Sequence, residues 1–308
     1  MKKIILKWYC GARFGRKSNV AWFSAVIGDR IEFGDYSTVK PLTVIRCNGE
    51  VRIGNYTEIS SFSVIYGPAD FHVGNKCYIG PQTWINVSED VVIGNGVGIG
   101  PRTMIFTHGS FLPYTDGYPV RFGKVTIGNN VWIAAGVFVH PGVEIGDNVF
   151  VNSRSVIKGN ISSGQVVEGF PAKEICPMEK IRRPVTPAKK DTLIINMLKH
   201  FASFVTQVYK KAKITEVDDN AVCLRLHGKD YLVGLVNSRG MVPSEFQKNH
   251  CDGIIALSNR RDWKLPSIKH KMTIFDFTTM KTSYTRDKLC RNLYLFFKQY
   301  YGIIFEYD

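Results

Sequence analysis

The sequence lacks the features of a membrane, secreted or zinc-finger protein. No apolar run approaches the roughly 18 residues that mark a transmembrane helix. The N-terminus opens like a signal peptide, but its apolar run, Ile4 to Leu6, ends at Lys7 and no small-residue cleavage site follows. The seven cysteines are scattered and form no CxxC pair. We therefore expect a cytoplasmic protein whose cysteines stay reduced.

Acidic residues are also scarce. Asp and Glu number 26 against 40 Lys and Arg, which gives a formal net charge of +14. Charged residues make up 21% and hydrophobic residues 44% of the chain, which excludes a disordered protein. A basic chain suits anionic partners. However, no helix-turn-helix, zinc finger or RNP motif is present, and we expect no nucleic-acid partner.

A six-residue repeat runs through the first half of the sequence. An aliphatic or aromatic residue recurs every six positions and is most often followed by glycine. Groups of three are separated by two extra residues, so Phe33, Ile53, Val73 and Ile93 are each 20 apart. The repeat breaks between residues 106 and 124. The periodic positions are Ile27, Phe33, Val39, Ile45, Ile53, Ile59, Ile65, Val73, Ile79, Ile85, Ile93, Ile99, Ile105, Ile127, Ile133, Val139, Ile145, Val151 and Ile157.

This period predicts a solenoid of short strands. Each unit makes one strand and one turn, its aliphatic residue points inward, and three units close one triangular coil. We expect the glycine at each corner to supply positive φ and close backbone approach. Because a lone coil buries too little apolar surface, the coils must stack and the ends need caps. Residues 1–26 are assigned to the N-terminal cap.

Two segments carry a family resemblance: VTIGNNVWIAAGVFVHPGVEIGDNVFVNSRSVIK (125–158) and EGFPAKEI (168–175). With them, residues 27–175 resemble the hexapeptide-repeat acyltransferases, most closely the maltose/galactoside, xenobiotic and polysaccharide O-acetyltransferases. The resemblance implies a mainly β fold, a left-handed parallel β-helix. It also implies acetyl-CoA as acyl donor and a homotrimer with its sites between neighbouring β-helices. The left-handed sense comes from the resemblance alone, because parallel crossovers are usually right-handed.

The break in the repeat, FTHGSFLPYTDGYPVRFGK, is the expected place for chemistry, because insertions in solenoids gather on one face that often binds ligand. The resemblance assigns the general base to His108. An imidazole titrates near neutral pH and suits removal of a proton from the acceptor as it attacks a thioester. Asn86 either helps to orient the acceptor or is a corner residue in the left-handed conformation that asparagine tolerates. Substrate contacts are expected from Arg102, Tyr114 and Asp116.

The resemblance also places coenzyme A along the later coils. Ala135 and Ser153 match the small corner residues beside the pantetheine arm, and Lys158 and Lys173 match the cations for its phosphates. Two positions depart from the family pattern. A Thr-Lys pair is typical at 158–159, where this chain has Lys158-Gly159, and a basic residue is typical at 176, where this chain has Cys176. Lys180, Arg182 and Arg183 are the possible substitutes for the missing phosphate contacts.

The other histidines of the repeat, His72 and His140, are expected to be structural. A relative of this fold, the γ-class carbonic anhydrases, binds zinc through a second histidine five residues after the first in the active loop. Position 113 is proline here, so no metal is expected.

The second half changes character after residue 175. A basic, proline-containing linker is expected at 176–190, and a small α+β domain of unknown role at 191–308. Its predicted elements are a helix at 191–211 capped by Asp191, a hairpin at 221–236 turning at 227–230, strands at 253–258 and 271–277, and a helix at 285–301. Residues 176–308 hold 23 basic and 13 acidic residues. This charge either binds an anionic partner or forms a solvated face.

The sequence thus favours an acetyl-CoA-dependent O-acetyltransferase acting on a saccharide or a cell-surface polysaccharide precursor, with direct transfer and no covalent enzyme intermediate. Two alternatives remain. One is N-acetylation of a nucleotide-linked amino sugar. The other is a non-catalytic β-helix scaffold whose C-terminal domain binds an anionic partner.

Overall fold

The computed structural model describes residues 11–110, 112–210, 212–217, 220–247, 251–260, 272–283 and 285–308. The chain divides into two compact units, Met1–Arg183 and Pro184–Asp308. Among the described residues, no helix combines the length and apolarity needed to cross a membrane.

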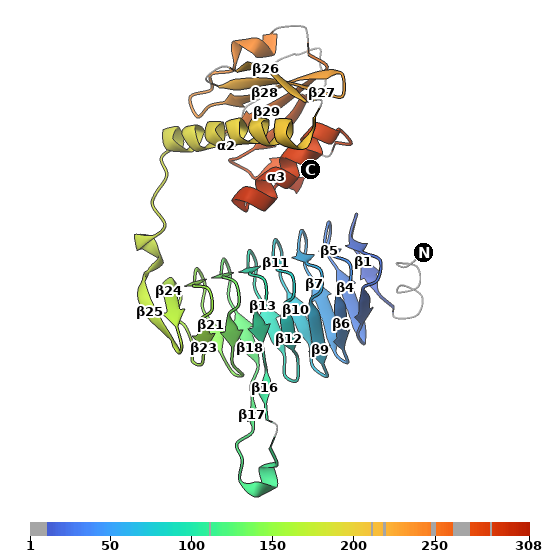
Figure 1. Ribbon diagram of the computed structural model, residues 1–308, viewed down its shortest axis with the longest axis vertical. Helices are drawn as coiled ribbons and strands as arrows, with labels where there is room; N and C mark the ends of the chain where they lie inside the picture. Colours follow the sequence, from blue (N-terminus) through green and yellow to red (C-terminus); the bar gives the residue numbers. More distant parts are fainter. Residues whose placement is uncertain are drawn as a thin grey trace. The chain divides into compact units, whose positions relative to one another are not determined.

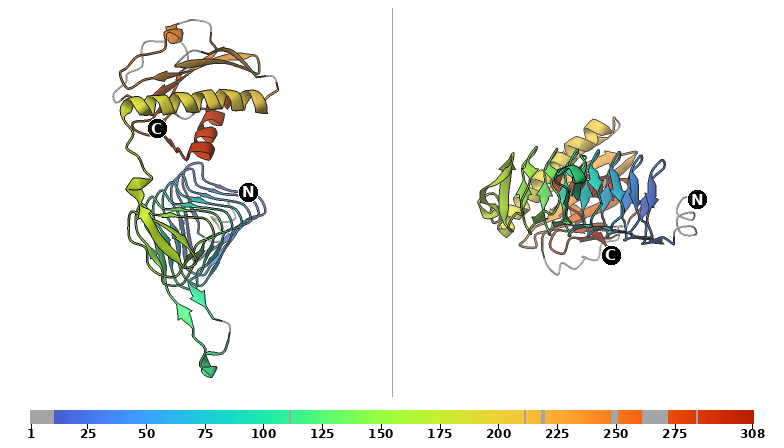
Figure 2. Two further views of the ribbon diagram at one scale, coloured as in Figure 1. Left: turned by 60° about the vertical axis from the view of Figure 1, so that its left-hand side comes forward. Right: turned by 90° about the horizontal axis from the view of Figure 1, so that it is seen from below.

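The first unit is a prism of three parallel sheets, here called faces A, B and C (Figures 1 and 2). Face A contains β1 (Arg13–Phe14), β4 (Arg30–Phe33), β7 (Glu50–Ile53), β10 (Phe71–Val73), β13 (Val91–Ile93), β18 (Val125–Ile127) and β21 (Glu144–Ile145). Face B contains β2 (Asn19–Val20), β5 (Thr38–Val39), β8 (Glu58–Ile59), β11 (Tyr78–Ile79), β14 (Gly98–Ile99), β19 (Trp132–Ile133), β22 (Phe150–Val151), β24 (Gln165–Gly169) and the antiparallel β25 (Ala172–Pro177). Face C contains β3 (Ala25–Ile27), β6 (Val44–Cys47), β9 (Val64–Gly67), β12 (Trp84–Asn86), β15 (Met104–Ile105), β20 (Phe138–Val139) and β23 (Val156–Ile157). The expected fold class, a left-handed parallel β-helix followed by an α+β domain, is confirmed.

The periodic residues line the interior of the prism. Every predicted inward position from Phe33 to Ile157 is at most 4% exposed. The first one, Ile27, was predicted wrongly: it is 51% exposed, and Val26 points inward instead, paired with Ile45. The reason is a slip of one residue between the first two coils, since Arg13 pairs with Glu32, 19 residues on, whereas Arg30 pairs with Glu50, 20 residues on.

The prism therefore begins earlier than the sequence indicated. Strands β1, β2 and β3 already form a coil between residues 13 and 27, so the assignment of residues 13–26 to a cap is wrong. At the other end, the hairpin of β24 and β25 follows the last coil.

The corner glycines are needed for close approach and not for positive φ. A Cβ on Gly54 would lie 2.5 Å from the carbonyl carbon of Gly74 in the next coil, and one on Gly74 would lie 2.6 Å from the carbonyl oxygen of Gly94. The left-handed conformation is found two residues later, at Tyr56 (φ 57°) and Lys76 (φ 55°). The expected close approach is confirmed, and the expected positive φ at these glycines is wrong.

A ladder of side-chain amides joins successive coils at the same corner. The Oδ1 of Asn55 accepts the backbone N–H of Asp35 at 2.6 Å, and the Oδ1 of Asn75 accepts that of Asn55 at 2.7 Å. Asn95, Asn129 and Asp147 continue this pattern. The ladder explains why asparagine or aspartate so often follows the corner glycine, because its side chain satisfies a backbone donor that the turn leaves unpaired.

The second unit is a mixed sheet with two helices on one face. The sheet order is β26 (Lys213–Val217), β27 (Ala221–Leu226), β28 (Lys229–Val236), β29 (Gly253–Ser258), β30 (Met272–Asp276), β31 (Lys281–Thr282) and β32 (Glu306–Tyr307). β26 to β28 are antiparallel, and β28 to β30 are parallel. Buried side chains of α2 (Pro187–Val208) and α3 (Lys288–Tyr301) pack into one apolar cluster with the sheet.

The predicted elements of this unit are present, with shifted ends. α2 begins at Pro187 and is capped by Thr186, so the predicted start and cap at Asp191 are wrong. Asp191 instead accepts hydrogen bonds from Ser238. The second helix begins at Lys288, not at 285.

The segment predicted as a linker, 176–190, is also partly structured. It contains the end of β25, the 3-10 turn η2 (Met178–Lys180) and the first turn of α2. Residues 211 and 271, at the ends of two predicted elements, lie outside the described residues.

Candidate active site

The repeat is interrupted at the corner between faces C and A. After β15 the chain leaves the coil as β16 (His108–Gly109), turns through η1 (Tyr114–Asp116) and returns as β17 (Arg121–Phe122), which pairs antiparallel with β16 (Figure 1). The stack of coils continues across the interruption, since Val91 pairs with Val125 in the usual parallel register. The insertion is thus a hairpin added to an intact prism.

A hollow of about 380 Å³ lies at the base of this hairpin. It is lined by side chains of β9, β12, β16 and β20 together with flanking residues of the corner. The lining residues are Tyr66, Asn86, Phe106, His108, Gly109, Ser110, Phe138, His140 and Pro141. The structure therefore brings together His108 and Asn86, the two residues to which the sequence gave catalytic roles.

The hairpin fixes the position of His108. Its backbone pairs with Phe122 in the two-stranded ladder, and its half-buried ring stacks on that of Phe122 with centroids 4.4 Å apart and planes 26° apart. Among the described residues, none hydrogen-bonds to the imidazole nitrogens. The ring is therefore held by stacking, and its nitrogens remain available to a ligand in the hollow.

Asn86 is held by a buried threonine that the sequence did not single out. The Thr107 hydroxyl is fully buried and lies 3.0 Å from the carbonyl oxygen and 3.1 Å from the Oδ1 of Asn86. It also accepts the backbone N–H of Glu89 at 3.0 Å. No described residue accepts a hydrogen bond from the Asn86 Nδ2. Asn86 ends strand β12 and has negative φ, so the alternative of a left-handed corner residue is wrong.

His140 also lines the hollow, although the sequence favoured a structural role for it. Its ring meets Phe138 edge-on at 4.9 Å, and its backbone N–H donates to Ile157 at 3.0 Å. Burial lowers the pKa of His140, and the nearby positive charges of Lys158 and Arg121 lower it further. The ring therefore stays neutral at pH 7 and offers one donor and one acceptor.

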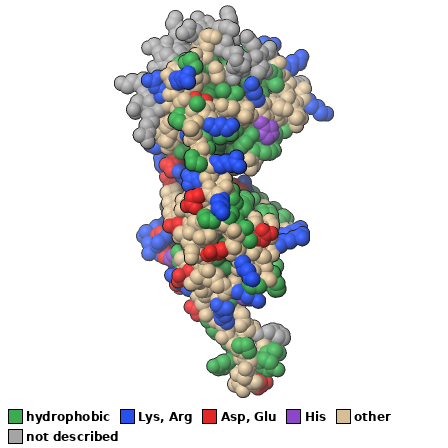
Figure 3. Space-filling model, turned by 90° about the vertical axis from the view of Figure 1, so that its left-hand side faces the viewer, with side chains coloured by type: hydrophobic (Ala, Val, Ile, Leu, Met, Phe, Trp, Pro, Cys, Tyr) green, Lys and Arg blue, Asp and Glu red, His purple; other side chains and the backbone are tan. Residues whose placement is uncertain are grey.

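The expected substrate contacts do not line the hollow. Arg102 stands at the corner between faces B and C, where its Nε donates to Gln82 at 2.9 Å. Tyr114 and Asp116 lie in the exposed hairpin tip, where Tyr114 is 74% exposed. Figure 3 shows hydrophobic side chains gathered at this tip, at the bottom of the view.

The expected coenzyme A contacts divide between two corners. Ala135 and Ser153 lie in consecutive turns between faces B and C, and the backbone N–H of Arg154 donates to Ala135 at 2.9 Å. Lys158 follows β23 at the far edge of face C, with its ammonium 5.2 Å from the ring centroid of Phe170. Lys173 is exposed in β25.

His72 belongs to a separate cluster on face A. Ligand atoms of Glu50, Asp70 and His72 lie within 4.8 Å of one another. However, Glu50 also pairs with Arg52 at 2.8 Å and with Arg30 at 3.5 Å. The guanidinium groups of Arg52 and Arg30 already neutralise the Glu50 carboxylate and disfavour a bound cation. We therefore interpret the cluster as an ion-pair network.

Comparison with known proteins identifies the kind of repeat. The family model described as bacterial transferase hexapeptide (six repeats) matches residues 124–159, the coils that follow the interruption. The resemblance to hexapeptide-repeat acyltransferases seen in the sequence is confirmed.

Individual relatives match over short segments. A galactoside O-acetyltransferase of Escherichia coli is 43% identical over 51 residues, 17% of this chain and 25% of that protein. A chloramphenicol acetyltransferase of Morganella morganii is 38% identical over 55 residues, 18% of this chain and 26% of that protein. Each match thus spans only about a quarter of the relative's length.

Among solved structures, a hexapeptide-repeat-containing acetyltransferase from Vibrio cholerae, complexed with acetyl coenzyme A, resembles the chain. It is 23% identical, and the alignment covers 47% of this chain and 69% of that one with a TM-score of 0.34.

Proposed function

We propose that the protein is an acetyl-CoA-dependent O-acetyltransferase that acts on a hydroxyl of a saccharide, such as a cell-surface polysaccharide precursor. The observation that carries this proposal is that His108 and Asn86 line one hollow at the interrupted coil. The short matches to proteins named as acetyltransferases support it. The six described cysteines are free thiols, which suits the reducing cytoplasm.

In the proposed reaction His108 is the general base. It takes the proton of the acceptor hydroxyl while the hydroxyl oxygen bonds to the thioester carbonyl carbon. The tetrahedral intermediate collapses with cleavage of the carbon–sulfur bond, and the imidazolium returns the proton to the leaving thiolate of coenzyme A. The Asn86 Nδ2 donates a hydrogen bond to the acceptor or to the developing oxyanion. The rings of Tyr66, Phe106 and Phe138 provide apolar walls for a sugar ring.

We propose that coenzyme A lies along face C. Ala135 and Ser153 at one border are small enough for the pantetheine arm to reach backbone amides, and Lys158 and Lys173 supply charge for the phosphates. Tyr114, Asp116 and Arg102 stand away from the hollow of their own chain. In this proposal they contact substrate in the site of a neighbouring copy.

A homotrimer is the proposed assembly, and face C is its proposed interface. One outward row of face C is apolar from coil to coil: Ala25, Val44, Val64, Trp84, Met104, Phe138 and Val156. The neighbouring outward row contains the exposed Arg46. Trp84 is 48% and Met104 is 43% exposed. On face A, by contrast, the outward positions include Glu32, Arg52 and Glu144. A continuous exposed apolar surface marks an interaction site, and here it borders the hollow.

The test is transfer by His108 variants. With acetyl-CoA and a panel of saccharides, release of free thiol should fall about 10²- to 10⁴-fold in His108→Gln and His108→Ala, the range for loss of a general base. His227→Gln, an exposed turn residue of the second unit, is the matched control and should keep full activity. Full activity in both His108 variants would refute the assignment.

The same assay, together with a calorimetric measurement of acetyl-CoA binding, separates the two alternatives. Transfer only to amino nucleotide sugars would establish N-acetylation, and failure of acetyl-CoA to bind in calorimetry would leave the scaffold alternative.

A further inference from the structure

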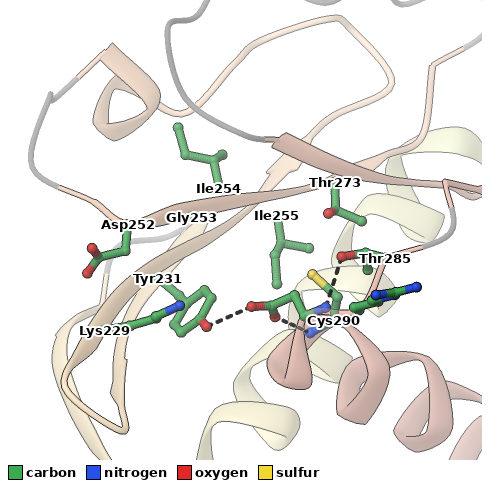
Figure 4. Close-up of a pocket in the computed structure, with 11 residues that line it drawn as sticks. Lys229, Tyr231, Asp252, Gly253, Ile254, Ile255, Thr273, Thr285 and Cys290 are labelled. Carbon is green, nitrogen blue, oxygen red and sulfur yellow. Dashed lines mark hydrogen bonds between the residues drawn. The ribbon is translucent and has the colours of Figure 1, made fainter.

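The second unit contains a hollow of its own, of about 280 Å³ (Figure 4). It lies where the parallel strands β28, β29 and β30 begin, beside the first turn of α3. Its lining residues are Lys229, Tyr231, Asp252, Gly253, Ile254, Ile255, Thr273, Thr285, Arg286, Asp287 and Cys290. None of them belongs to the proposed acetyl-transfer site.

Hydrogen bonds fix the polar groups on one side of this hollow. The buried Tyr231 hydroxyl donates to the Oδ2 of Asp287 at 2.8 Å, and the Oδ1 of Asp287 accepts the backbone N–H of Cys290 at 3.0 Å. Burial raises the pKa of Tyr231, and the hydrogen bond to Asp287 raises it further, so the phenol stays a donor. The Cys290 thiol also hydrogen-bonds to Asp287. A carboxylate has about four acceptor positions, so one is left for a ligand.

The charges around the hollow balance. Asp252 and Asp287 supply two carboxylates, and Lys229 and Arg286 supply two cations. Neither cation has an ion-pair partner in the part of the chain that the structure describes. The Oδ2 of Asp252 accepts a hydrogen bond from the backbone N–H of Asp230 at 2.7 Å. The two carboxylates would repel a phosphate in this hollow, and the two cations would repel an amine. The arrangement therefore favours a ligand without net charge.

An uncharged ligand must then satisfy both kinds of group. Hydroxyl groups do so, because each can donate to a carboxylate and accept from an ammonium or guanidinium group. Ile255 and the Tyr231 ring, both on the helix-covered face of the sheet, provide apolar surface for the C–H bonds of a ring. The volume of about 280 Å³ lies just below the roughly 300–1,000 Å³ typical of small-molecule sites, which suits one ring and not a nucleotide.

We propose that this hollow binds a single uncharged sugar residue, so that the second unit is a carbohydrate-binding module. This inference goes beyond the proposed acetyl transfer and does not depend on it, because no residue is shared between the two hollows.

The experiment uses the full chain and ligand-observed NMR. Saturation transfer to methyl glycosides of glucose, galactose, mannose and N-acetylglucosamine is measured for the wild type and for Asp252→Asn, Lys229→Gln and Tyr231→Phe. Lys199→Gln, an exposed lysine of α2 outside the hollow, is the matched control. Circular dichroism checks that every variant is folded. Inorganic phosphate serves as the anionic probe and glycine as the zwitterionic probe.

We expect at least one glycoside to bind, with affinity about tenfold lower in Asp252→Asn and Lys229→Gln, as for loss of a hydrogen bond to a charged group. Lys199→Gln should bind as the wild type does. Three results would overturn the inference: no glycoside binds, binding survives in all three variants of the hollow, or phosphate or glycine binds there in place of the sugars. Loss of sugar binding in His108→Gln alone would move the binding to the first unit and also overturn it.

Discussion

The candidate active site depends on one buried hydroxyl, that of Thr107. It joins Asn86, on the coil below the insertion, to the backbone of Glu89 at the next corner. A threonine beside a loop histidine is unremarkable in sequence, and its role follows only from the register that stacks one coil on another. This is why the sequence predicted roles for His108 and Asn86 but missed the residue that holds Asn86.

Replacement of Thr107 by valine tests this role. Thr107→Val keeps the volume but leaves the Glu89 N–H and the Asn86 Oδ1 without their buried partner. We expect a loss of about 1–3 kcal/mol in the free energy of unfolding, measured by urea denaturation. We also expect a lower kcat, because the Asn86 side chain then keeps only the long hydrogen bond of 3.4 Å from the backbone N–H of Ser88. Thr126→Val on the outside of face A is the control, and equal effects of the two substitutions would contradict the assigned role.

His140 gives the protein a pH-dependent stability. Its folded pKa is lowered by burial and by Lys158 and Arg121. Below about pH 6.5 the unfolded chain therefore binds this proton more readily than the folded chain does. We expect the contribution of His140 to the free energy of unfolding to be full above that pH and to fall as the pH drops below it. Urea denaturation between about pH 5 and 8 should show a flatter profile for His140→Gln. An unchanged profile would contradict this.

At the scale of elements, the sequence predicted the middle of each element better than its ends. The buried aliphatic residues recur every six positions because each side of the prism takes six residues. Their positions could therefore be predicted from the period. The wrong inward position at Ile27 results from a first coil of 19 residues, and the helix start at Pro187 results from capping by Thr186. The hydrophobic period contains information on neither feature. The residues lining the hollow come from four coils, and only the fold brings them together.

The corner glycines provide a test of how tightly the coils stack. Gly74→Ala places a methyl group 2.6 Å from the carbonyl oxygen of Gly94, in backbone that cannot turn aside. We expect destabilisation of about 1–3 kcal/mol, the usual cost of overpacking, seen as a lower urea midpoint. Gly159→Ala, whose Cβ meets nothing within 4 Å, should be neutral. Neutral behaviour of Gly74→Ala would mean that the coils can separate locally.

At the scale of the whole molecule, the apolar outward residues of face C predict self-association. Trp84→Lys combined with Met104→Lys puts two charges on this face without touching the core, since both side chains already point outward. We expect sedimentation velocity to show a trimer for the wild type and a monomer for the double variant. Trp132→Lys, an equally exposed aromatic position on face B, is the control. A trimer that survives the double variant would place the interface elsewhere.

The hairpin of β16 and β17 enters and leaves the prism without disturbing the pairing of Val91 with Val125. The prism and the hairpin are thus structurally separable. A segment of different length or composition placed between Gly109 and Arg121, which pair directly in the hairpin ladder, would keep His108 and Phe122 and join the same prism. Exchange of this one segment would therefore change the surroundings of the hollow with little effect on folding.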